Sequence, residues 1–293
     1  DLAGSVRARD SRKVSATSVR GRLAELVQLA DELCERAGIS RREITQTVIG
    51  TPGVYDPKRN AIALTGGLAG LDRPSALDGL RDAFGPSLAL ENDVDAAALA
   101  ERTHGYGRDV RNFAWVHVGT GIGMGLVLDG RLHRGAHGVA GEIAFLPLGD
   151  GDSGEARRRG PLEAAAAAAG IVRSARLAGI RGPVSARRVF AAAARGDERA
   201  AAIVANEARL VASAICCVVT VMDPELVVLG GGIGQAPGFA EVVTEALRDM
   251  APVLPEVRVS ALGSDVVVDG CLAEGASLAW NQLTSGLIGQ VAE

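Results

Sequence analysis

Apolar residues recur three and four positions apart in several stretches of this chain. Between residues 18 and 37 this spacing is regular, and Gly38 follows the last apolar turn, so the pattern predicts a helix that ends at this glycine. Pro224 ends the longest such stretch, because proline disfavours helical backbone in the residue before it. The alanine run at 164–169 predicts a closely packed helix. The same criterion predicts further helices over residues 73–84, 94–105, 184–195, 197–222, 239–250 and 271–283.

Short apolar runs bounded by turn residues predict the strands. They cover residues 47–50, 87–90, 113–118, 124–128, 226–229, 257–261 and 265–268. Strands that alternate with helices indicate α/β units with a mostly parallel sheet. The order of the elements therefore predicts a two-lobed α/β protein whose ligand cleft lies between the lobes.

The composition supports packed cores and offers no basic face. Of the 293 residues 47% are hydrophobic, and 31 Lys and Arg stand against 35 Asp and Glu, for a formal charge of −4. Binding of the DNA backbone needs a basic surface, so this chain is not expected to hold DNA itself, although an acidic effector domain joined to a DNA-binding domain is compatible with the charge. Four cysteines without CxxC spacing, and no uninterrupted apolar run of about 20 residues, indicate a cytoplasmic protein without a membrane span.

Polar residues follow the apolar run at 87–90. The segment 90–101 reads LENDVDAAALAE, which places Asn92 and Asp93 at the end of a predicted strand. Such strand ends face the ligand crevice in open α/β sheets, and a carboxylate there can take the proton of a hydroxyl that attacks a phosphate. The alternative is that Asn92 and Asp93 cap the helix that starts at Val94, and the two roles are compatible.

Glycine-rich turns follow two other predicted strands. The first is GTGIGMG at 119–125, and the second is GGGIG at 230–234. Glycine turns let backbone N–H groups approach phosphate oxygens, although each is equally an ordinary tight turn. The candidate phosphate-binding and nucleotide-binding residues are Gly119, Thr120, Gly121, Gly123, Gly231 and Gly232.

Together, LENDVDAAALAE and the segment 117–145, HVGTGIGMGLVLDGRLHRGAHGVAGEIAF, resemble the core of the ROK family (repressor, open reading frame, kinase). This family contains sugar kinases and sugar-responsive repressors. The resemblance implies the two-lobed actin-like ATPase (ribonuclease H-like) fold. It implies a small lobe of residues 1–92 completed by residues 272–293, and a large lobe of residues 93–271 with the sugar site and the oligomer surface.

The resemblance also implies roles for single residues. Asp93 matches the family's catalytic base, and GGGIG resembles the segment near the adenosine. Carboxylates make strong, directional bonds to sugar hydroxyls, and the implied sugar-binding residues are Asn92, Asp93, Gly53, His137, Glu142 and Glu163. The alternatives are a first-turn helix residue for Glu163 and an ordinary surface histidine for His137. The segment Gly67–Leu71 resembles a loop that often ends in Trp, where this chain has Leu71.

Three departures from the family pattern bear on function. Phe145 stands where members usually have a zinc-binding histidine, and residues 149–163 contain no cysteine. Zinc needs about four N, S or O ligands, so we expect no structural zinc, and a solvated loop at 149–160. The family kinases begin with an Asp-Gly-rich hairpin, and the first residues here, DLAGSVRAR, resemble the strand that follows it.

These departures favour a ROK transcriptional regulator over an enzyme. In this interpretation the chain is the sugar-sensing and oligomerising part, binds a sugar or sugar phosphate, forms a homodimer or homotetramer, and contacts a DNA operator through an upstream helix-turn-helix domain. The alternative is a kinase that transfers phosphate from ATP, with Mg²⁺, to glucose or an N-acetylated hexosamine and uses Asp93 as general base. A third possibility is a sugar-binding protein without catalysis.

Overall fold

The computed structural model describes residues 1–56, 58–63, 73–149 and 153–291. These residues form two compact units, Asp1–Ala100 with Asp265–Glu293, and Glu101–Ser264. The functional lobes expected from the sequence, 1–92 with 272–293 and 93–271, stay a prediction. The segment Gly67–Leu71 lies outside the described residues.

The described residues of the first unit form two small sheets with helices packed against them. Strand β1 (Thr47–Thr51) pairs in parallel with β4 (Leu88–Asn92), and β2 (Val54–Asp56) pairs with β3 (Ala61–Ala63) as an antiparallel hairpin. Helices α1 (Val19–Ala37) and α2 (Pro74–Phe84) confirm two predicted helices, and α1 ends at Gly38, whose φ of 71° suits glycine. Ile62, Leu77 and Leu80 form its small core, with Leu23 and Leu26 of α1 packed against it.

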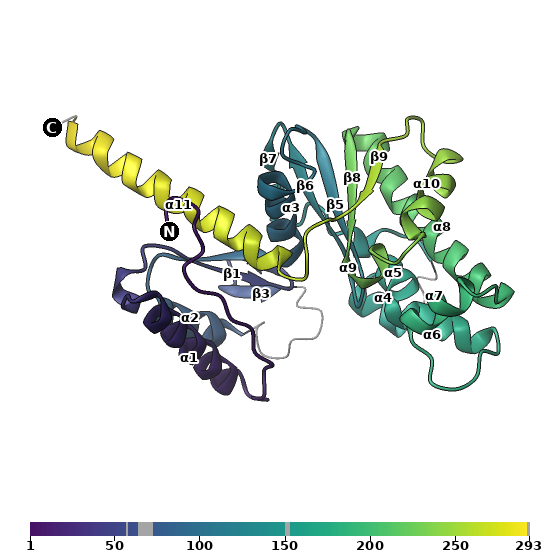
Figure 1. Cartoon of the computed structure of the whole chain (residues 1–293), viewed down its shortest axis with the longest axis horizontal. Coiled ribbons are helices and arrows are strands. Elements are labelled where there is room, and N and C mark those ends of the chain that lie inside the picture. The colour runs from purple at the N-terminus through teal and green to yellow at the C-terminus, as the bar shows by residue number, and fades with distance from the viewer. Residues whose placement is uncertain (57, 64–72, 150–152, 292–293) are drawn as a thin grey trace. The chain divides into compact units, whose positions relative to one another are not determined.

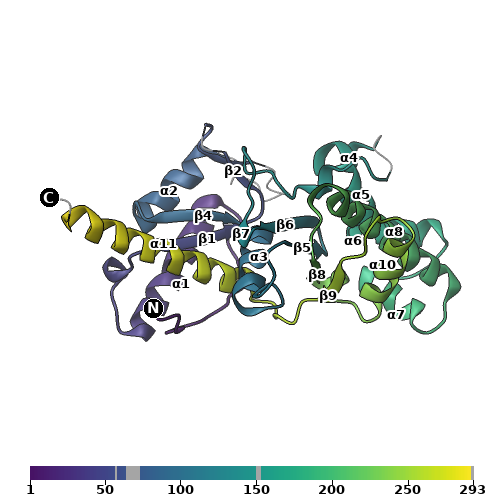
Figure 2. The same ribbon diagram turned by 90° about the horizontal axis from the view of Figure 1, so that it is seen from above.

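Helix α11 (Val266–Val291) completes the first unit, and it packs on β1 (Figures 1 and 2). The predicted strand at 265–268 is wrong, because this apolar run forms the first turn of α11 instead. A Cβ at Gly50 of β1 would lie 2.7 Å from Val267 Cγ1, so glycine allows the close approach of helix and strand. Residues 1–10 do not form the strand that the family resemblance implied. Arg9 instead holds this segment against the start of α11, because its Nη1 donates a hydrogen bond to Asp265 at 2.7 Å.

The second unit is built on a five-stranded sheet with the order β7-β6-β5-β8-β9. Strands β5, β8 and β9 run parallel, and β6 and β7 continue the sheet with antiparallel pairing. Every residue of β8 is buried, as an apolar run in a covered parallel sheet predicts. The strands are β5 (Phe113–Val118), β6 (Ile122–Leu128), β7 (Arg131–Leu132), β8 (Leu226–Gly230) and β9 (Glu256–Val259).

Helix α8 (Glu198–Met222) is the central helix of this unit, and it packs against α7 (Ala186–Ala193) and α10 (Phe239–Arg248). By length and composition alone it could cross a membrane, but core helices share this property, and part of it faces the unit's core. Its buried face includes Glu207, which is 2% exposed. Within the described part of the chain Glu207 Oε1 has no hydrogen-bond partner, and burial raises the pKa of this carboxyl well above its usual range.

Two predictions for residues 149–169 are wrong in part. The expected solvated loop contains a short helix, α4 (Gly154–Arg159), which starts where the Ser153 side chain accepts the N–H of Ala156. The alanine run does not form one helix, because extended backbone at Ala167 (ψ 172°) separates α5 (Pro161–Ala166) from α6 (Ala168–Leu177). Apolar composition predicted burial correctly but could not locate this break.

Candidate functional site

Asn92 and Asp93 lie where β4 meets α3 (Asp93–His104). Asn92 Oδ1 accepts the N–H of Val94 at 3.0 Å and that of Asp95 at 3.3 Å, which confirms the capping interpretation. Asn92 Nδ2 donates to Gly53 O at 3.1 Å, so the structure brings these two predicted sugar-site residues together. Asp93 Oδ1 accepts the N–H of Val94 at 2.9 Å.

The turn between β5 and β6, residues 119–121, has all three of its carbonyl groups bonded to protein. Gly119 O accepts the N–H of Ala168, and Gly121 O accepts the N–H of Gly119, both at 2.9 Å. Thr120 O accepts from Arg159 Nη2 at 3.0 Å. Within the described residues the N–H groups of Thr120 and Gly121 have no hydrogen-bond acceptor. The turn therefore offers two amide donors to an anion.

Glu163 lies directly behind this turn, with only 12% of its side chain exposed. Its Oε2 accepts the N–H of Ile122 at 3.0 Å, and its Oε1 accepts from Arg159 Nε at 2.5 Å. The sequence interpretation missed Arg159, because it assigned the whole arginine run to a solvated loop. The available signal was the spacing of four residues between Arg159 and Glu163, although a glycine and a proline stand between them.

The second glycine turn lies beside the first. Gly231 begins the short helix α9 (Gly231–Gly234) with a φ of 80°, and a Cβ there would lie 2.5 Å from Val118 O. A Cβ at Gly231 or at Gly119 would also meet the ring of His117, at 2.8 Å and 2.7 Å. The structure thus groups the predicted phosphate and nucleotide residues around the ends of β5 and β8. Gly123 lies in β6, opposite His117, and Gly232 faces open space.

Glu142 and His137 lie in the segment that follows β7. Gly141 anchors this segment, because a Cβ there would lie 1.9 Å from Met124 O of β6. Glu142 is half-buried just before a short helix, Ile143–Phe145. His137 is exposed, and the described part of the chain gives it no hydrogen-bond partner. Phe145, at the position of the family histidine, is 44% exposed.

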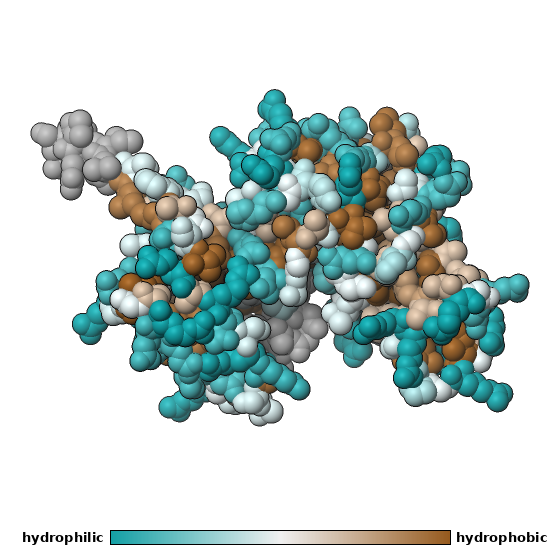
Figure 3. Space-filling view, in the orientation of Figure 1, coloured by the Kyte–Doolittle hydropathy of each residue, from teal (hydrophilic) through white to brown (hydrophobic). Residues whose placement is uncertain are grey.

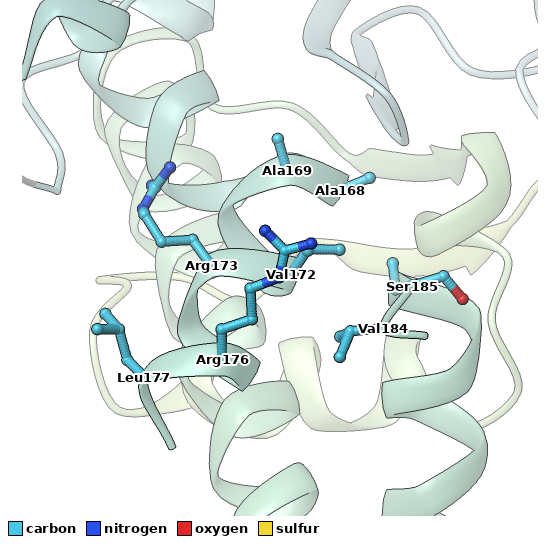
Figure 4. A pocket seen from close by; sticks show the side chains of 9 residues that line it. Ala168, Ala169, Val172, Arg173, Arg176, Leu177, Val184 and Ser185 are labelled. Atoms are coloured by element: carbon cyan, nitrogen blue, oxygen red, sulfur yellow. The ribbon is translucent and has the colours of Figure 1, made fainter. Parts of the chain in front are cut away.

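A groove of about 670 Å³ lies between α6 and the start of α7 (Figure 4). Small apolar side chains line it, and Arg173 and Arg176 of α6 bring positive charge to it. Arg173 bonds Glu155 at 3.1 Å. Ala168, which also lines the groove, is the residue whose N–H bonds Gly119 O, so the groove adjoins the 119–121 turn.

No group of three or more His, Cys, Asp or Glu in the described ranges is arranged to hold a metal ion. Residues 150–152, within the segment where family members carry zinc ligands, lie outside those ranges.

Relatives in sequence include two sugar kinases and a bifunctional enzyme. The chain is 39% identical over 189 residues to the bifunctional enzyme NanE/NanK of Brucella suis biovar 1, a match that covers 64% of this chain and 34% of that protein. It is 40% identical over 177 residues to the N-acetylmannosamine kinase of Citrobacter koseri, covering 60% and 59%. It is 30% identical over 244 residues to the glucokinase of Thermotoga maritima, covering 78% and 75%. The chain therefore spans only part of the length of the first two relatives.

Solved structures give the same picture of the fold. The ROK hexokinase from Thermus thermophilus matches with a TM-score of 0.76 and 33% identity, over 91% of this chain and 88% of that one. A ROK family transcriptional regulator, a homologue of the E. coli MLC protein, matches with a TM-score of 0.77 over 95% of this chain and 74% of that one, but at 24% identity this likeness concerns the fold alone.

The fold is thus the α/β actin-like ATPase fold that the family resemblance implied. A model of the ROK family matches residues 1–279, and the chain belongs to the ROK family.

Proposed function

We propose that this protein is an ATP-dependent sugar kinase that phosphorylates an N-acetylated hexosamine or glucose, with N-acetylmannosamine as the first substrate to test. The observation that carries the proposal is the 119–121 turn, which directs its carbonyl groups to the protein and leaves the N–H groups of Thr120 and Gly121 for an anion. Kinases among the relatives support the same choice. The regulator, which the sequence analysis placed first, becomes the second candidate.

In this proposal Asp93 removes the proton from the attacking sugar hydroxyl. A positioned base of this kind contributes a rate factor of about 10²–10⁴. ATP enters as its Mg²⁺ complex, so the ion belongs to the substrate, and most of the remaining catalysis is positioning and charge stabilisation. The N–H groups of Thr120 and Gly121 bind the phosphates, and Gly231 and Gly232 border the nucleoside. The groove beside α6 has room for the rest of the nucleotide.

Recognition of the sugar is assigned in the same proposal to Asn92, Asp93, Gly53, His137, Glu142 and Glu163. Asn92 and Gly53 already share a hydrogen bond. Glu163 uses one oxygen for Ile122 and one for Arg159, and a carboxylate has about four lone-pair sites, so it retains capacity for a sugar hydroxyl.

The proposal includes self-association into a homodimer or homotetramer. The second unit exposes apolar side chains that an oligomer interface would cover, among them Val221 at 82% and Val253 at 60%. Figure 3 shows hydrophobic residues interspersed with hydrophilic ones on the face in view.

The test is ADP release by the complete protein with ATP, Mg²⁺ and a panel of hexoses and N-acetylhexosamines, with Asp93→Asn as the control. Sugar-dependent turnover that the control abolishes is the expected result. No turnover with any sugar, combined with sugar-dependent binding to an operator DNA, would overturn the proposal in favour of the regulator.

A further inference from the structure

The 119–121 turn is held by an arginine that the proposed chemistry does not use. We propose that Arg159 is a positioning residue: with Glu163 it fixes the Thr120–Gly121 peptide so that the N–H group of Gly121 faces the nucleotide phosphates beside that of Thr120. This inference rests on the proposed kinase function and deepens it. It assigns a role to the last arginine of the run in α4.

The contacts form a closed set around the turn. Arg159 Nη2 donates to Thr120 O at 3.0 Å, and its Nε donates to Glu163 at 2.5 Å. Glu163 in turn accepts the N–H of Ile122 at 3.0 Å, one residue beyond the turn. Arg159 thus holds the carbonyl side of the Thr120–Gly121 peptide, and its partner holds the strand that follows. A peptide group whose oxygen is fixed on one side presents its N–H on the other, because the group is planar.

The Gly121 position fits tightly into this arrangement. A Cβ at Gly121 would lie 2.7 Å from Glu163 Oε2, so the carboxylate occupies the space of any side chain. Removing Arg159 leaves Thr120 O and one Glu163 oxygen without their donor. The substitution destabilises the turn mainly through the loss of these charge-assisted hydrogen bonds. The ion pair itself contributes little, because the Arg159 side chain is 32% exposed and water screens its charge.

The junction between α4 and α5, which follows Arg159 directly, is closely packed. Gly160, between α4 and α5, has a φ of 93°, and a Cβ there would lie 2.1 Å from Ala144 O. At the other end of α4, Glu155 bonds Arg173 of α6 at 3.1 Å. Helix α4 is therefore tied to its surroundings at both ends, and Arg159 projects from a supported element.

The experiment compares Arg159→Gln and Arg159→Lys with Arg158→Gln, an exposed neighbour for which the described residues show no contact. Steady-state kinetics are measured with ATP, Mg²⁺ and the best sugar of the panel. We expect the KM for ATP to rise about tenfold in Arg159→Gln, since a charge-assisted bond is lost. The KM for the sugar should change less, because Glu163 keeps the bond from the N–H of Ile122. Arg159→Lys should recover part of the loss, and Arg158→Gln should behave as wild type.

Competitive inhibitors locate the effect. The inhibition constant of tripolyphosphate should rise with the KM for ATP, and that of adenosine, which has no phosphate, should not change. Equal changes in the sugar and ATP constants, or no change in either, would overturn the positioning role.

Hydrogen exchange separates this inference from the proposed function. The N–H groups of Gly119, Ile122 and Ala168 are all bonded in the structure, so peptides that contain them should exchange faster in Arg159→Gln than in Arg158→Gln. If the wild-type protein phosphorylates no sugar, the kinase proposal fails. The exchange rates still show whether Arg159 holds the 119–121 turn. Identical exchange in the two variants would show that Arg159 does not hold the turn.

Discussion

The end of β4 and the turn between β5 and β6 are both strand ends with proposed chemistry, but they are held in different ways. Asn92 is fixed by N–H groups two and three residues further along and by one bond to Gly53, 39 residues earlier. The 119–121 turn is fixed by side chains 39 and 41 residues beyond the groups they contact. Two of the three contacts of Asn92 are therefore local to its own helix, whereas the side chains that hold the turn and its following strand both come from distant residues, in α4 and α5.

The largest expected effect concerns the chemistry at the first strand end. Asp93→Asn preserves size and the capping contacts but removes the base, so kcat should fall by about 10²–10⁴, with little change in the melting temperature. Phosphotransfer assays and thermal unfolding of the same preparation measure both quantities. A variant that keeps its activity would remove Asp93 from the role of base.

The next largest effect is expected from a steric clash in the 119–121 turn. Gly121→Ala places a methyl group against Glu163, so the unfolding free energy should fall by about 1–3 kcal/mol, as for other overpacked sites, and the KM for ATP should rise. Gly263→Ala is the control, because a Cβ there meets nothing within 4 Å. The additional change Glu163→Ala should restore part of the lost stability. Denaturant titrations that find Gly121→Ala as stable as the control would contradict the contact.

The smallest effect tests the local support of the first strand end. Asn92→Ala removes the acceptor for two N–H groups and the bond to Gly53, and should lower the unfolding free energy by about 1 kcal/mol. Asn92→Asp keeps the capping oxygen but not the donor to Gly53, and should lose less. Urea unfolding of the three proteins ranks them, and the reverse order would mean that the capping oxygen stabilises less than a carboxylate facing the Gly53 carbonyl oxygen destabilises.

The same contrast explains what the sequence could predict. The segment 87–105 contains its own signals, an apolar run and then capping residues, and both β4 and α3 form there. The glycine turns were also recognised from local pattern, and the fold followed from the family resemblance. Arg159 was missed because its partner Thr120 lies 39 residues away, a distance at which hydrophobic periodicity carries no information. The predicted strand at 265–268 failed for a related reason: three consecutive valines suit a strand as well as a half-buried first helical turn.

Glu207 gives the second unit a dependence on protons that its sequence alone would not suggest. Its carboxyl is buried without a partner for Oε1 in the described structure, and its pKa in the folded state is raised above the ordinary value of 4.5. Between the unfolded and the folded pKa this unit therefore takes up a proton as it folds. The stability that this group contributes is fully present below the unfolded pKa and is lost as the pH rises through the folded pKa, with a slope of about 1.4 kcal/mol per pH unit between them. Glu207→Gln should remove this slope in unfolding measured from pH 5 to 8. The second unit is consequently more stable toward acidic pH than toward alkaline pH, as far as Glu207 is concerned.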